Sequence, residues 1–226
     1  MSWFANLFSG SLTPDQRLSP DQQQRLREWW QWPAIDLSLP HRQSRYVVVD
    51  VEGGGNENLA DRPLVIGAVA VANGSIAFND AFQLSLSGEV GSASSTFDPQ
   101  AAEGLIDFLH FAGKSPLVFY HAMFAARSLE RILANLLHVE SVQPCLDLAL
   151  VMPDLFREVG ESNWRLDTWL EHFKIASIDR QRAVSDAYAT AQLLLIAQAR
   201  AAKNGFPTPE ALFGLEKARR QMYPNR

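Results

Sequence analysis

Residues 46–52 read Tyr-Val-Val-Val-Asp-Val-Glu, a run of valines that ends in two acids two positions apart. Consecutive β-branched residues favour a buried strand. Because side chains alternate across a strand, Asp50 and Glu52 are expected to project from the same face. Two carboxylates on one half-buried face repel each other and resist desolvation, and a cation between them removes both penalties. Oxygen ligands favour Mg²⁺ or Mn²⁺; the alternative is a strand end at which both acids reach solvent.

The sequence around this strand predicts an α/β domain. Two further strands, at residues 64–72 and 75–87, flank a turn signal at Asn73-Gly74 and complete an antiparallel meander. Alternating helices and short strands follow it. We expect strands at 116–120 and 143–146 and helices at 98–111, 123–138, 147–158, 165–173, 183–203 and 208–221. This order predicts a mixed five-stranded sheet flanked by helices.

The chain is expected to divide into three segments. Residues 1–43 form a helical, tryptophan-rich N-terminal extension, residues 44–205 the main domain, and residues 206–226 a C-terminal helix. Trp29, Trp30 and Trp32 lie within four positions and need burial, so the extension should pack on the body or bind a protein partner.

Composition limits the functional classes. The net charge of −5 over 226 residues argues against a broad electrostatic nucleic-acid footprint. The negative net charge is still compatible with a small active-site cleft that binds nucleotides through metal ions, because the ions supply positive charge. The single cysteine, Cys145, excludes an internal disulfide framework and indicates a reducing cytoplasm. No apolar run reaches the roughly 18–20 residues of a membrane span, so none is expected.

A third acid, Asp186, is a candidate partner for the first two. Small residues surround it, which would let its helix approach a neighbour closely. The alternative is that Asp186 only complements the helix dipole from the first turn. We interpret another acid, Asp147, as a helix cap.

Three motifs, in order and spacing over roughly residues 45–200, resemble the DEDD superfamily of 3′–5′ exonucleases. The likeness is greatest to the proofreading epsilon subunit of bacterial DNA polymerase III and its relatives, including ribonuclease T. The first motif is Asp50-Val51-Glu52 followed by glycines, the second spans residues 119–131, and the third spans residues 181–186. The resemblance implies a ribonuclease H-like fold and a substrate that is a nucleic acid 3′ end or a nucleotide.

The family's mechanism uses two divalent ions that bind the scissile phosphate. By resemblance, Asp50 would bridge both ions, and Glu52 and Asp186 would complete the first site. These three residues are therefore the expected catalytic and metal-binding residues, with Mg²⁺ or Mn²⁺ as the cofactor. The expected substrate-binding residues are Gly53, His121 and Phe124.

Three positions depart from the family pattern. Ala125 replaces the acid that would help hold the second ion, and Gln181 replaces the histidine that would act as general base. Glutamine cannot accept a proton at neutral pH. Gly53 replaces a threonine beside the terminal nucleotide. An Ala125 introduced to trap substrate would leave Gln181 and Gly53 unexplained.

These departures predict a site that keeps one ion and has impaired catalysis. His121 is expected to serve the structure or the substrate rather than to replace the missing base. Two other hypotheses stay open: a working exonuclease with a modified site, and a non-catalytic interaction module that uses the exonuclease fold as a scaffold. In the last case the tryptophan-rich segment would be the contact surface.

Overall fold

The computed structural model describes residues 17–53, 64–86, 97–139, 143–160, 165–176 and 182–222, without the side chains of residues 78 and 122–124. Within these ranges one sheet has the strand order β3-β2-β1-β4-β5. Its strands are β1 (Tyr46–Glu52), β2 (Leu64–Ala72), β3 (Ser75–Leu86), β4 (Leu117–Phe119) and β5 (Cys145–Asp147). The first three are antiparallel, and β1, β4 and β5 are parallel. The predicted α/β, ribonuclease H-like mixed sheet of five strands is confirmed.

The predicted helices are also present. They are α1 (Pro20–Gln31), α2 (Pro99–Ala112), α3 (Ala122–Leu137), α4 (Leu148–Leu155), α5 (Leu166–His172), α6 (Ala183–Lys203) and α7 (Pro209–Met222), with short 3-10 turns η2 (His41–Gln43) and η3 (Arg157–Val159). The helix expected at 147–158 ends early, at Leu155. Pro153 lies inside it and has no backbone N–H to donate, which favours termination there. None of the helices in the described ranges is long and apolar enough to cross a membrane.

Local signals explain two of the boundaries. Asn73 and Gly74 have φ values of 55° and 70°, the left-handed conformation that a two-residue hairpin turn requires. Asp98 caps α2 by accepting a hydrogen bond from the Gln100 backbone N–H at 2.9 Å, and Pro99 takes the first helical position.

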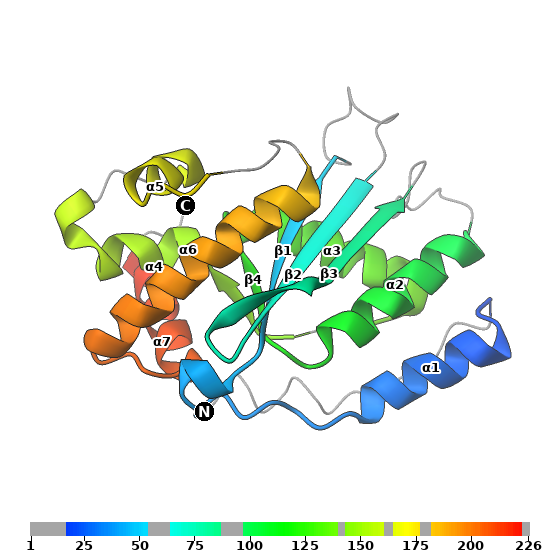
Figure 1. The fold of residues 1–226 in the computed structure, drawn as a ribbon. Helices are drawn as coiled ribbons and strands as arrows, with labels where there is room; N and C mark the ends of the chain where they lie inside the picture. The colour runs from blue at the N-terminus through cyan, green and yellow to red at the C-terminus, as the bar shows by residue number, and fades with distance from the viewer. Residues whose placement is uncertain are drawn as a thin grey trace.

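Alternation along β1 divides the core into two layers. Val47 and Val49 belong to a hydrophobic cluster shared with α1, α2 and α3. Tyr46 and Val48 belong to a second cluster shared with α4, α6 and α7. Figure 1 shows α6 running diagonally across the sheet. Because side chains alternate along the strand, Asp50 and Glu52, two and four positions after Val48, face the layer that contains α6.

The N-terminal extension packs on the body through α1. Trp29 is fully buried, and its indole N–H donates to the carbonyl oxygen of Gly113 at 3.0 Å. The Lys114 Nζ lies 3.4 Å from the centroid of the Trp29 ring, a cation–π contact; burial lowers the pKa of Lys114 to about 8. Arg25 bonds to Glu103 and Asp107 of α2, and Figure 1 shows α1 beside α2. The prediction that the extension packs is confirmed for residues 17–43, the part that the structure describes, while a protein partner stays a prediction. Trp32 keeps 39% of its surface exposed.

His41 joins the connection after α1 to the segment between α6 and α7. Its Nε2 lies 2.9 Å from the carbonyl oxygen of Phe206, and its Nδ1 lies 2.6 Å from the hydroxyl of Tyr46. A carbonyl can only accept, so Nε2 carries the proton and the neutral ring accepts the Tyr46 O–H at Nδ1. Burial lowers the pKa of His41 below its ordinary value of 6.5.

This burial predicts acid sensitivity. The folded state binds fewer protons at His41 than the unfolded state does. The free energy of unfolding is therefore unaffected by the protonation of His41 above pH 6.5, and it decreases as the pH falls from 6.5 toward the lower pKa of the folded state. Urea unfolding at pH 7.5 and 5.5 should show this loss in the wild-type protein and a smaller loss in His41→Asn. His172 is exposed, so His172→Gln is the control and should lose as much stability between pH 7.5 and 5.5 as the wild type does. An equal loss of stability in all three proteins would contradict the role of His41.

Candidate metal centre

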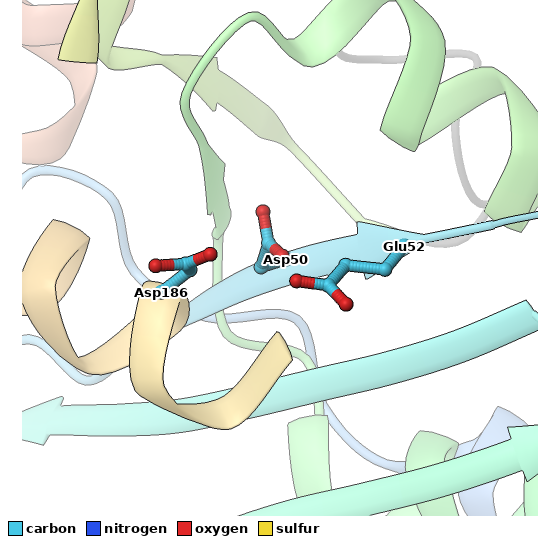
Figure 2. A group of neighbouring side chains, drawn as sticks. All are labelled: Asp50, Glu52 and Asp186. Carbon is cyan, nitrogen blue, oxygen red and sulfur yellow. The ribbon is translucent and has the colours of Figure 1, made fainter. Parts of the chain in front are cut away.

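Three carboxylates converge at the carboxyl end of β1. Asp50 and Glu52 project from β1, and Asp186 projects from the first turn of α6 toward them (Figure 2). One oxygen of each side chain lies within 4.8 Å of one oxygen of the other two, and all three side chains are partly buried. The shared face expected of Asp50 and Glu52 is therefore present, and the structure brings Asp186 to the same face.

The first turn of α6 reaches the acids because β2 carries a glycine opposite Asp50. Gly67 pairs with Asp50 in the antiparallel register of β1 and β2. A Cβ at Gly67 would lie closer than 3.0 Å to the backbone of both Ala183 and Val184 at the start of α6. Only a residue without a side chain allows this approach. Gly67 thereby sets the distance between Asp186 and the two strand acids.

The electrostatics of the cluster disfavour three free charges. Burial raises the pKa of Glu52, and the nearby Asp186 charge raises it further. A divalent cation among the carboxylates would compensate both effects, because it replaces water as the partner of the charges and screens their repulsion.

The donor set fits a hard divalent ion. Oxygens on opposite sides of one octahedral Mg²⁺ lie about 4.2 Å apart, because each bond is about 2.1 Å. The observed limit of 4.8 Å therefore requires only small side-chain rotations for all three acids to contact one ion. Three all-oxygen ligands suit Mg²⁺ or Mn²⁺ and leave positions for water or phosphate oxygens. The acidic cluster supports the use of a divalent metal.

The other predicted site residues are distributed around this edge. Gly53 follows β1 with φ of 84°, a conformation that would strain the threonine of the family pattern. His121 precedes α3 and its side chain is exposed. Ala125, in the first turn of α3, packs partly against the hydrophobic cluster on the opposite face from α6. The side chain of Phe124 and the whole of Gln181 lie outside the described residues, so their roles stay predictions.

Two contributions to the site were not identified from the sequence. The first is Gly67, for which a glycine inside a valine- and alanine-rich strand was the available signal of close backbone approach. The second is a second bond made by Asp147. It caps α4, as expected, by accepting from Ala149 N at 3.0 Å, and the same oxygen accepts from His121 N at 3.0 Å. No sequence pattern signals a bond between residues 26 positions apart.

Sequence comparison finds relatives among bacterial polymerases. The chain is 29% identical over 165 residues to a PolC-type DNA polymerase III of Caldanaerobacter subterraneus and 30% identical over 187 residues to that of Bacillus subtilis. These matches cover 68% and 76% of this chain but only 11% and 13% of the polymerases. The chain thus spans about an eighth of the length of these relatives. No protein-family model matches it.

Structure comparison finds Escherichia coli exonuclease I. A zinc-bound complex of that enzyme with single-stranded DNA has a TM-score of 0.49 and 19% identity, covering 70% of this chain and 41% of exonuclease I. A complex with a dT13 oligonucleotide has a TM-score of 0.46 and 17% identity, covering 71% and 42%. Both TM-scores lie below 0.5.

The glycine contact predicts a specific loss of metal affinity. Gly67→Ala should push the start of α6 away from β2, destabilise the fold by about 1–3 kcal/mol through overpacking, and weaken Mn²⁺ binding at least about tenfold because Asp186 moves with the helix. Calorimetric titration with Mn²⁺ and urea unfolding measure the two effects.

The matched control is Gly214→Ala. Gly214 lies within α7, where an added Cβ would have no atom within 4 Å, so this variant should keep its Mn²⁺ affinity and gain up to about 1 kcal/mol of stability from the higher helix propensity of alanine. Unchanged Mn²⁺ affinity in a folded Gly67→Ala protein would show that the close approach does not set the site.

Proposed function

We propose that the chain is a member of the DEDD superfamily of 3′–5′ exonucleases. It binds the 3′ end of a nucleic acid through one divalent ion and hydrolyses it poorly. The observation that carries this proposal is the convergence of Asp50, Glu52 and Asp186 on one partly buried point. Acids from two elements far apart in the sequence meet there at a cost in repulsion, which a resident cation removes.

Three residues would hold the ion. Asp50 lies between Glu52 and Asp186 in Figure 2, which suits it to contact a cation from the centre of the cluster. When bound, Mg²⁺ or Mn²⁺ supplies a Lewis acid for a phosphoryl oxygen and lowers the pKa of a coordinated water. The protein's own part is to orient the carboxylates and to keep the site partly desolvated, which strengthens their interaction with the ion and with phosphate.

Two features support impaired hydrolysis. By the family resemblance, position 125 would carry the carboxylate that helps to hold a second ion; Ala125 offers only a methyl group, which packs partly against the core. Gln181 has no group that can take a proton from water at neutral pH. A general base contributes about 10²–10⁴ in rate, so a site without one still binds its substrate and turns it over slowly.

Metal stoichiometry tests the binding half of the proposal. Titration of the wild-type protein with Mn²⁺ should show one ion, lost in both Asp50→Asn and Asp186→Asn because each variant removes one of three charged ligands. Asp36→Asn is the control and should bind as the wild type does, because Asp36 is an exposed acid whose bonds within the described residues are to nearby Ser38. Absence of Mn²⁺ binding at millimolar concentration would remove the proposed function and favour the scaffold hypothesis.

Restoration of the missing groups tests the catalytic half. With Mn²⁺, the wild-type protein should trim 5′-labelled single-stranded DNA or RNA slowly or not at all. Ala125→Asp combined with Gln181→His should raise the rate by about 10²–10⁴, and a further Asp50→Ala should return it to baseline. Rapid wild-type trimming that Asp50→Ala abolishes would show instead that the modified site is a working exonuclease.

A further inference from the structure

Asp147 joins two parts of the fold that are distant in the sequence. It ends β5 and caps α4, and its Oδ1 accepts hydrogen bonds from Ala149 N and His121 N, both at 3.0 Å. Only 6% of its surface is exposed. A buried carboxylate that accepts two backbone N–H bonds is a strong and directional anchor.

The backbone that Asp147 holds is unusual. His121 has φ and ψ of 58°, the left-handed conformation, and its side chain makes no capping bond to α3. This conformation costs free energy for a residue with a Cβ and persists only where the surroundings fix it. The bond from His121 N to Asp147 supplies that constraint. The direction in which the chain leaves β4 and enters α3 therefore depends on Asp147.

The helix that follows His121, α3, begins at the edge of the sheet that carries the three acids. β1 and β4 are parallel, with Val48 opposite Val118. Two residues after this pair lie Asp50, on β1, and Tyr120, which directly follows the end of β4; α3 starts two residues after Tyr120. The second motif thus enters its helix at the level of the metal centre, and α3 contacts β1.

Asp147 lies next to the C-terminal helix α7. Glu216, on α7, is 6% exposed and lies near Asp147: burial raises the pKa of Glu216, the Asp147 charge raises it further, and the Asp147 backbone N–H lowers it. α7 packs against both β5 and α4. Asp147 is therefore held by its place in the sheet, where it pairs with Phe119, and by its two side-chain bonds, as a residue that orients another segment requires.

We propose that Asp147 is a positioning residue for substrate binding: through His121 N it sets the place of the second motif, which receives the 3′-terminal nucleotide of a single-stranded nucleic acid beside the metal centre. This inference rests on the proposed function. It assigns Asp147 no contact with metal or substrate, so its loss should weaken nucleic-acid binding and leave ion binding intact.

The test compares two helix caps. Asp147→Ala removes the cap of α4 together with the link to His121, whereas Asp98→Ala removes only the cap of α2, whose described bond is to Gln100 N. Three quantities are measured in the full chain with Mn²⁺: the Kd for a fluorescent single-stranded DNA oligonucleotide, the Kd for Mn²⁺, and the hydrogen-exchange rate of the His121 amide.

Asp147→Ala should weaken oligonucleotide binding about tenfold, accelerate exchange at the His121 amide, and keep the Mn²⁺ Kd within about twofold. Asp147→Asn keeps an acceptor oxygen in place and should restore most of the oligonucleotide affinity, which also covers the case in which the alanine variant does not fold. Asp98→Ala should match the wild type in all three measurements.

Two results would overturn the inference. The first is equal oligonucleotide affinity in Asp147→Ala and Asp98→Ala, and the second is a parallel loss of Mn²⁺ affinity in a folded Asp147→Ala or Asp147→Asn protein. Failure of the proposed function is distinguishable, because the wild-type protein itself would then bind no oligonucleotide, whereas failure of the inference leaves wild-type binding intact.

Discussion

The close approach of α6 to β2 at Gly67 is the constraint on which the candidate site depends. Gly67 pairs with Asp50, so the glycine lies directly beside the first acid of the cluster. A side chain there would meet the backbone of Ala183 and Val184. Because protein interiors are close-packed, the helix could not absorb that volume in place. The same atom-level contact therefore sets both the packing of α6 on the sheet and the position of Asp186.

The acid cluster is a local conflict within an otherwise consistent fold. β1 buries valines on both faces and then delivers two carboxylates to the layer occupied by α6. Burial and the Asp186 charge both raise the pKa of Glu52, because a partly desolvated carboxyl beside another acid is harder to ionise. Folds keep such conflicts chiefly where a site requires them. The positive end of the α6 dipole faces the cluster and offsets part of the repulsion.

Sequence patterns predicted most of the fold. Consecutive β-branched residues and the Asn73-Gly74 turn predicted the meander, and the helix ranges expected from the sequence include the long α6. They also predicted that the tryptophan-rich segment packs, but its partners in the body could not be read from the sequence. Trp29 meets Gly113 and Lys114, contacts set by how α1 lies on α2. A lone lysine in a sequence carries no signal that an indole covers it.

The sequence by itself determined that Asp50 and Glu52 share a face, because the alternation of a strand is a local property of the backbone. It also supplied the order of motifs and the residue types of a metal site. Only the tertiary structure decided that Asp186 reaches that face, that Gly67 permits the approach, and that Asp147 holds the backbone before α3. Each of these depends on the packing of elements distant along the chain, where a separation of a few ångströms is fixed by interlocking side chains and not by local sequence.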